Sequence, residues 1–294
     1  MLRFLLLAAA VLVFIGAIHV CVQAQDKPLV AEWVNNDLEG VSAVRQLIPF
    51  EKQNIQVVKA RLRKDWSIEE TNLGFGGLYL TLAKGQGYAK SYVYALIYEG
   101  RVAMYEAGIE SYSDEWPKIR ERVLEKWEAE DLPQVALGEH GIAYKRTLES
   151  IMHLYQARVA SALGPTRDAS VAPDLEKSYA SLTDPMNNST ISMTRRDEEI
   201  GTLLNANRTD LLENVLKAYN PGARVLAALA LLELQKGGTR LSRVISKAIV
   251  RVLNLKVNLH ACMFDICSYL TAKEAINWFD SDLAFPVPKV RRRS

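Results

Sequence analysis

The stretch "LGFGGLYLTLAKGQGYAKSYVYALIYEGRVAMYEAGI", residues 73–109, contains three runs that are rich in tyrosine, valine and leucine. Turn residues separate these runs at residues 84–87 and at Glu99-Gly100. Glycine accepts the positive φ that tight hairpins require, and aromatic and β-branched residues favour strands. The alternating stretch "IQVVKARLRK", residues 55–64, is typical of a further half-buried strand. We therefore expect an antiparallel sheet of about four strands.

Helical patterns follow this sheet. Residues 118–130, "KIRERVLEKWEAE", place Ile119, Val123 and Trp127 on one helical face. Residues 140–164 have the pattern of one long amphipathic helix. Strands followed by helices predict an α+β domain.

The composition shifts toward proline, serine, aspartate and asparagine in residues 165–194. Such a segment is typical of a connector, with one or two helical turns in its middle. It divides an α+β domain, residues 25–164, from a helical domain, residues 195–285. A basic tail, residues 286–294, follows.

The clearest helical pattern is "RTDLLENVLKAYNPGARVLAALALLEL", residues 208–234. Thr209 or Asp210 is the expected N-cap of a first helix. The sequence Asn220-Pro221-Gly222 predicts a tight turn, with the proline beginning a second helix rich in small residues. Two antiparallel helices with close backbones should result.

This stretch resembles one unit of a bacterial HEAT-like repeat, with its apolar first helix, its asparagine-proline turn and Arg224 soon after the turn. One unit cannot bury its own apolar face, so neighbouring helices are needed. The expected fold class is therefore α+β, with an N-terminal antiparallel sheet and helices followed by an all-α, HEAT-like C-terminal domain. The resemblance implies protein–protein contact and supplies no catalytic residue.

The N-terminus, "MLRFLLLAAAVLVFIGAIHVCVQAQ", has the layout of a secretory signal peptide over residues 1–24. Arg3 precedes an apolar run of about 15 residues, shorter than the roughly 20 that a membrane-spanning helix needs. Cleavage after Ala24 would export the protein to the periplasm or the exterior. Two alternatives stay open: an uncleaved membrane anchor, and a lipid attached to Cys21.

The charge balance is close to neutral. The net charge of +2 falls to +1 when a signal peptide containing Arg3 is removed. This balance argues against a dedicated nucleic-acid binder. With 49% hydrophobic and 24% charged residues, the chain can bury a sizeable core.

Common catalytic motifs are absent from the sequence: it has no G-x-S-x-G, H-E-x-x-H or G-x-x-x-x-G-K-[ST] pattern. No cofactor is expected, and an enzymatic role is disfavoured but stays open. His140, beside Glu139 in a glycine-flanked stretch, is the catalytic candidate, and Arg146 could help to hold an anion. The alternative is a loop histidine.

Tyrosines are dense between residues 79 and 112. A tyrosine offers a flat apolar body with a polar tip, so these side chains could form a binding face for a glycan or a peptide. The alternative is that strands simply favour tyrosine. The binding candidates are Tyr92, Tyr94, Tyr98 and Tyr105.

Residues 260–267, "HACMFDIC", hold the two cysteines that lie outside the signal-like segment. In an oxidising compartment we expect a disulfide between Cys262 and Cys267. Five residues apart in a straight helix their Cα atoms would be too distant, so the chain must turn between Met263 and Ile266. The turn would close a small loop that links a helix ending near Leu255 to a helix beginning near Thr271. Two alternatives are a pair of free thiols and a metal site made of His260, Cys262, Asp265 and Cys267.

Three functional hypotheses follow. The first is an exported protein-binding or scaffolding protein that contacts an unidentified protein partner through its helical domain. The second is an envelope hydrolase or ligand-binding enzyme that uses the N-terminal domain. The third is a membrane-anchored assembly factor, with membrane contact only if the N-terminal segment is uncleaved or lipidated.

Overall fold

The computed structural model describes residues 41–42, 45, 54–62, 66–85, 89–111, 114, 116–132, 136–138, 140–186, 191–192, 195–263 and 266–275. The strands are β1 (Ser67–Gly74), β2 (Gly77–Lys84), β3 (Lys90–Tyr98), β4 (Arg101–Glu110), β5 (Ala136–Leu137), β6 (Gly141–Thr147), β7 (Ile191–Ser192), β8 (Asn258–Met263) and β9 (Ile266–Thr271). The helices are α2 (Ile55–Leu62), α3 (Trp116–Ala129), α4 (Glu149–Leu163), α5 (Pro173–Thr183), α6 (Gly201–Asn205), α7 (Thr209–Val215), α8 (Pro221–Lys236) and α9 (Arg243–Leu253), with a π-helical turn, η2 (Arg195–Ile200), before α6.

The first sheet has the strand order β1-β2-β3-β4-β6-β5, and every neighbouring pair is antiparallel. Strands β1 to β4 form a meander with hairpin turns at Phe75-Gly76 and Glu99-Gly100, and these four turn residues all have positive φ. The antiparallel sheet predicted from residues 73–109 is confirmed, and the expected helix over residues 118–130 corresponds to α3.

Residues 55–64 were expected as a strand, and that prediction is wrong, because residues 55–62 form α2. The reason lies in the spacing of the apolar residues. Ile55, Val58 and Leu62 are three and four residues apart, and all three are buried on one face of the helix. Burial at this spacing requires a helical conformation.

The expected helix over residues 140–164 is also wrong in its first part, since residues 141–147 form β6 and α4 begins only at Glu149. Strand β6 covers the open edge of β4, which would otherwise expose unpaired backbone groups. Gly108 permits this pairing, because a Cβ added to it would lie 2.1 Å from the carbonyl oxygen of Ile142.

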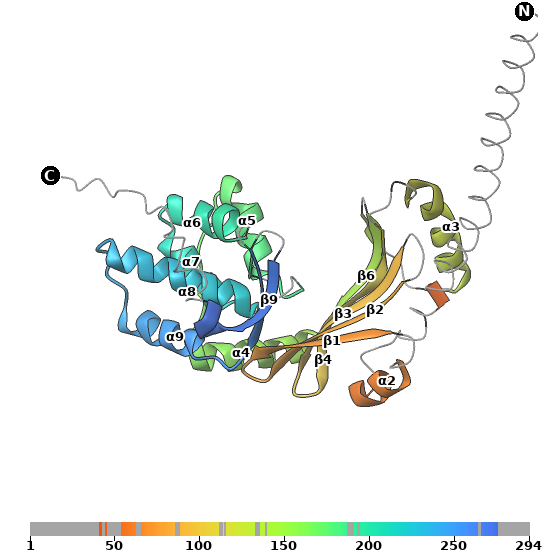
Figure 1. The fold of residues 1–294 in the computed structure, drawn as a ribbon, viewed down its shortest axis with the longest axis horizontal. Helices are drawn as coiled ribbons and strands as arrows, with labels where there is room; N and C mark the ends of the chain where they lie inside the picture. Colours follow the sequence, from red (N-terminus) through yellow and green to blue (C-terminus); the bar gives the residue numbers. More distant parts are fainter. Residues whose placement is uncertain are drawn as a thin grey trace, which may run out of the picture.

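The two faces of this sheet belong to different apolar clusters. Helices α2 and α3 cover one face, where Leu80, Leu82 and Val93 are fully buried and pack in one cluster with Trp127. The other face contributes to a larger cluster that includes Leu96 and continues through α4. The cluster extends into the part of the chain that contains α5 to α9, which we call the helical half. Figure 1 shows α3 on one side of the sheet, and α5 to α9 gathered beyond α4.

The helical half is built around α7 and α8, which pack against each other. The side chain of Asn220 caps α8 by accepting from the amide of Ala223 at 3.1 Å, and Pro221 is the first helical residue, as predicted. The small residues of α8 are buried. The N-cap of α7 is Arg208, so the prediction of Thr209 or Asp210 at that position is wrong.

The C-terminal part is not entirely helical. Strands β7, β8 and β9 form a second sheet, in which β8 and β9 are an antiparallel hairpin. Leu259 and Ala261 alternate with more exposed residues and are fully buried against the helices. The α+β class is thus confirmed, and this sheet corrects the all-α description of the C-terminal part. The segment expected as a connector contains α5, whose Leu175 and Leu182 are buried in the same core.

Arg224 joins the helical half to the first sheet. Its side chain is completely buried and lies over the ring of Phe75, with 5.1 Å between the guanidinium carbon and the ring centroid. Nη1 donates to the carbonyl oxygen of Leu73 at 2.7 Å, and Nε donates to the carbonyl oxygen of Ala218. One side chain of α8 therefore holds the β1–β2 turn through its main chain.

Candidate functional site

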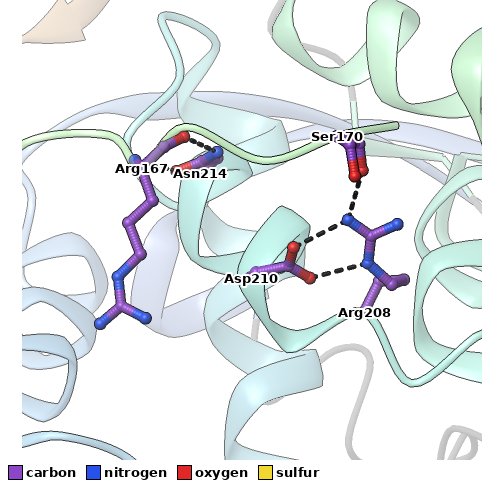
Figure 2. A network of polar contacts seen from close by, with 5 residues as sticks. All are labelled: Arg167, Ser170, Arg208, Asp210 and Asn214. Atoms are coloured by element: carbon purple, nitrogen blue, oxygen red, sulfur yellow. Dashed lines mark hydrogen bonds and ion pairs between the residues drawn. The ribbon is translucent and has the colours of Figure 1, made fainter. Parts of the chain in front are cut away.

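Residues 164–172 cross the helical half without regular secondary structure, and α7 holds this segment through its backbone. The Asn214 amide makes two hydrogen bonds to one residue. Its Oδ1 accepts from the backbone N–H of Arg167 at 2.8 Å, and its Nδ2 donates to the carbonyl oxygen of Arg167, also at 2.8 Å. Figure 2 shows Asn214 beside the Arg167 backbone, with the Arg167 side chain extending away from the contact. Asn214 thus recognises main-chain atoms only.

Two basic side chains hold the segment on either side of Arg167. Arg208 Nη2 donates to the carbonyl oxygen of Ser170 at 2.6 Å, and Lys217 Nζ donates to the carbonyl oxygen of Pro165 at 2.7 Å. The carbonyls of three residues in this short segment are therefore bound by side chains from one helix and its flanking residues. We call Arg208, Asn214 and Lys217 the α7 clamp.

The spacing of the apolar residues explains why α7 presents this clamp. Leu211, Leu212 and Val215 are fully buried in the large apolar cluster. Asn214 and Lys217 are three residues apart, so they lie next to each other on another face of the chain. The sequence "TDLLENVLKAY" therefore alternates core residues with residues that bind the segment.

An ion pair fixes the position of Arg208. Its Nε and Nη2 contact the two carboxylate oxygens of Asp210 at 2.9 and 2.7 Å (Figure 2). This hydrogen bonding lowers the pKa of the Asp210 carboxyl and raises the pKa of Arg208. The two-point contact orients the guanidinium toward Ser170.

Charges cluster where the segment crosses the end of α7. Glu213 is buried, and its Oε2 lies 3.3 Å from Nε of Arg167. Burial lowers the pKa of Lys217, the nearby Glu213 carboxylate opposes this change, and the charge of Arg167 adds to it. Lys217 is thus a buried cation beside one carboxylate that Arg167 already pairs.

A cavity of about 500 Å³ lies beside the clamp. It is bounded by α4, the held segment, α5 and the residues after α7, and Tyr179, Asn214, Lys217 and Tyr219 are among its lining residues. The side-chain amide of Gln156 donates to the hydroxyl of Tyr219 at the wall formed by α4. The cavity therefore combines small apolar side chains, two tyrosines and a buried ammonium group.

Two of the predicted binding tyrosines lie together on the sheet. The rings of Tyr92 and Tyr94 are stacked with their centroids 4.5 Å apart. Tyr92 donates to Glu106 Oε1 at 2.9 Å, and Tyr94 donates to Glu110 Oε1 at 3.2 Å. Burial and Glu110 raise the pKa of Tyr94 to about 12, and burial and Glu106 also raise the pKa of Tyr92. Both hydroxyls are engaged with carboxylates of the neighbouring strand.

The other two predicted tyrosines lie elsewhere. Tyr98 is at the far end of β3 and packs against Tyr155, with ring centroids 5.3 Å apart. Tyr105 is paired in register with Ala95, so it points to the opposite face of the sheet, where it is fully buried beside Tyr144. The structure does not bring the four tyrosines into one surface.

His140 is exposed in the turn before β6, and its carbonyl oxygen accepts from the amide of Ser111 at 2.6 Å. Glu139 lies outside the described residues. Arg146 is near the other end of β6, six residues away, which corresponds to about 20 Å of extended chain. The strand therefore separates His140 from Arg146.

The "HACMFDIC" stretch forms the β8–β9 hairpin, so the chain reverses between Met263 and Ile266, as the sequence predicted. The helices expected near Leu255 and Thr271 are present, since α9 ends at Leu253 and residues 272–275 are helical, and the link between them contains two strands. Cys262 lies directly opposite Cys267, whose side chain is outside the described residues. Nε2 of His260 is 3.8 Å from Sγ of Cys262. Asp265 is also outside the described residues, and the described histidines, cysteines and acids form no group of three suited to a metal ion.

Sequence inspection missed the α7 clamp. The only signal was a pair of polar residues, Asn214 in α7 and Lys217 just after it, beside the apolar residues of that helix, and this pair does not indicate the segment they bind. In the part of the chain that the structure describes, no helix is long and apolar enough to cross a bilayer, and residues 1–40 lie outside that part. Comparisons with protein-family models, with curated proteins and with solved structures give no match.

Proposed function

We propose that this chain is an exported protein-binding protein, and that its helical half binds an extended segment of a partner protein on the α7 clamp. The observation that carries this proposal is the pair of hydrogen bonds from Asn214 to the N–H and C=O of Arg167. A side-chain amide used in this way substitutes for the backbone of a neighbouring strand, so it can hold an extended chain with any residue except proline at the bound position.

The part of the segment that now occupies the clamp is largely exposed. Residues 165–168 and Ser170 are exposed, and the side-chain anchors of the segment are the ion pair of Arg167 with Glu213 and the partly buried Ala169, Val171 and Ala172. Its main advantage over a partner is its covalent tether, which for a short linker gives an effective concentration in the millimolar range. A partner segment that adds buried side-chain contacts to the same main-chain bonds can displace it.

The small residues and close helices of α7 and α8 are compatible with the proposed HEAT-like character of this region. Repeats of this kind expose extended surfaces that bind other proteins. The proposed repeat, residues 208–234, includes Asn214, Lys217 and Arg224. The clamp therefore lies within the proposed repeat.

A peptide-binding measurement tests the proposal. In an Arg167→Pro variant the tethered segment loses the N–H that Asn214 binds, so it competes less well for the clamp. A fluorescent peptide that copies residues 164–172 should bind this variant at least tenfold more tightly than it binds the unmodified protein. Adding Asn214→Ala should abolish the gain. Equal binding to the folded single and double variants would contradict the proposal.

We further propose that Cys262 and Cys267 form a disulfide in the exported protein. Directly opposed residues of an antiparallel pair have Cα atoms about 4.5–5.5 Å apart, which a disulfide can span. The intact mass of protein produced with its own N-terminus should correspond to a chain that begins at Gln25. Both thiols should be alkylated only after reduction. Full-length protein in which Cys262 and Cys267 are both freely labelled would contradict export.

A further inference from the structure

The cavity beside the α7 clamp has the properties of a small-molecule site. Its volume of about 500 Å³ falls in the range of ligand pockets, which is roughly 300–1,000 Å³. Ala157 and Val159 of α4 and Ala218 contribute apolar surface, and Tyr179 and Tyr219 contribute rings. Such a lining suits the body of an organic molecule.

Lys217 supplies a buried charge in this cavity. Only 7% of the residue is exposed, yet it carries an ammonium group with three donors. Among the described residues, the carbonyl oxygen of Pro165 is the acceptor that Nζ contacts. Buried ammonium groups usually satisfy more than one donor, so an acceptor that enters the cavity would complete the bonding of Lys217.

The local charges favour an anionic acceptor. Glu213 is the carboxylate nearest to Lys217 in sequence, and its Oε2 is paired with Nε of Arg167 at 3.3 Å. His153 and Arg167 are the other basic residues that line the cavity. When Arg167 is paired with Glu213, the charge of Lys217 is not neutralised by that carboxylate, and the group of three residues has a net charge of +1.

We infer that the cavity binds a small organic monocarboxylate. The carboxylate accepts from the Lys217 ammonium, and the aliphatic or aromatic body lies against Val159, Ala218 and the two tyrosines. A single buried cation suits one negative charge, whereas a doubly charged phosphate would require further donors. This inference does not rest on the proposed partner binding, because the cavity is present with the segment held by the clamp, and residues 164–167 of that segment line it.

Calorimetry on the full chain tests this inference. The probes are straight-chain carboxylates of about four to ten carbons and benzoate, each paired with its neutral amide, together with inorganic phosphate. At least one carboxylate should bind ten times or more tightly than its amide. Lys217→Gln should remove this preference, and Lys177→Gln, an exposed lysine on α5, should leave it unchanged.

A second variant separates binding from folding. Ala160→Phe fills the cavity from the wall formed by α4 and keeps Lys217, so it should weaken the carboxylate without altering the charge. Circular dichroism establishes that each variant is folded. Three results would overturn the inference: no carboxylate binds better than its amide, Lys217→Gln retains the preference, or phosphate binds as tightly as the best carboxylate. The peptide measurement with Arg167→Pro is unaffected by any of them.

Discussion

Arg224 and the α7 clamp perform the same operation in two different environments. Both use polar side chains of the helical half to bind main-chain carbonyls of a segment distant in sequence. Arg224 is completely buried between apolar side chains and an aromatic ring. The clamp lies between exposed chain and a cavity of about 500 Å³. The first contact can therefore serve only the fold, while the second remains accessible to a competing chain or a ligand.

The largest expected effect is at Arg224. Arg224→Ala removes donors from the buried carbonyls of Leu73 and Ala218 and leaves a cavity beside Phe75. We expect the free energy of unfolding to fall by about 3 kcal/mol or more, measured by urea denaturation. Gln235→Ala, at an exposed position of the same helix, should change it by less than about 0.5 kcal/mol. A loss below about 1 kcal/mol for Arg224→Ala would show that the contact between α8 and the β1–β2 turn does not depend on this side chain.

A second substitution, in the sheet, disturbs the same contact between the first sheet and the helical half. A Cβ added to Gly77 would lie 2.5 Å from the Tyr155 ring, which is fully buried and near Arg224. Gly77→Ala should therefore destabilise the protein by about 1–3 kcal/mol in urea denaturation. In the matched variant Gly138→Ala the nearest atom is 3.5 Å away, and no destabilisation is expected. Equal stabilities of the two variants would mean that Tyr155 moves at little cost.

Loss of the Asn214 contact should release the held segment without unfolding the rest of the protein. Asn214→Leu removes both bonds to Arg167, whose backbone can bond to water once released, so the loss of stability should be about 1–2 kcal/mol. Trypsin cleavage after Arg167, followed by mass spectrometry, should become at least several-fold faster. Cleavage after the exposed Lys177 of α5 provides the internal reference. An unchanged ratio of the two cleavage rates would show that Asn214 does not restrain the segment.

The contact at Arg208 should contribute less. Its side chain is about one quarter exposed and that of Asp210 is more exposed, so solvent weakens this ion pair. Arg208→Ala should lower the free energy of unfolding by less than about 1 kcal/mol. A loss as large as that of Arg224→Ala would remove the distinction between the two environments.

The comparison also shows what the sequence can reveal. The sheet was predictable because the glycines near Gly76 and Gly100 and the alternating tyrosines follow strict local rules. The asparagine-proline turn was predictable for the same reason. In contrast, residues 55–62 satisfy both a strand and a helix pattern locally, and burial of Ile55, Val58 and Leu62 decides between the patterns.

The clamp and the cavity depend on contacts between distant parts of the chain, so no local pattern could identify them. Asn214 is 47 residues from its partner Arg167, and Arg224 is 151 residues from Leu73. The tyrosines illustrate the same limit. Residue spacing indicates that Tyr92 and Tyr94 share a face, but only the register with β4 assigns Tyr105 to the other face.

The smallest effect on stability is expected from substituting Lys217. The pH dependence of this effect gives the clearest distinction between the α7 clamp and the buried Arg224. Burial lowers the pKa of Lys217 below its ordinary value of about 10.4. Between the folded and the unfolded pKa the folded protein binds fewer protons than the unfolded chain, so stability should rise with pH through this window. Lys217→Met should lose this rise and change stability at pH 7 by less than about 1 kcal/mol, because water can bond to the exposed Pro165.

Urea denaturation between pH 7 and pH 10 provides the measurement, with Lys177→Met on the exposed face of α5 as the control. The stability of the unmodified protein relative to Lys217→Met should increase with pH, whereas its stability relative to Lys177→Met should stay constant. A relative stability that falls with pH would mean that folding favours the charged Lys217, as it would if a carboxylate stabilised this residue within the fold. The expected result instead describes a buried cation that stabilises the fold little, as a binding residue would, which is the opposite of Arg224.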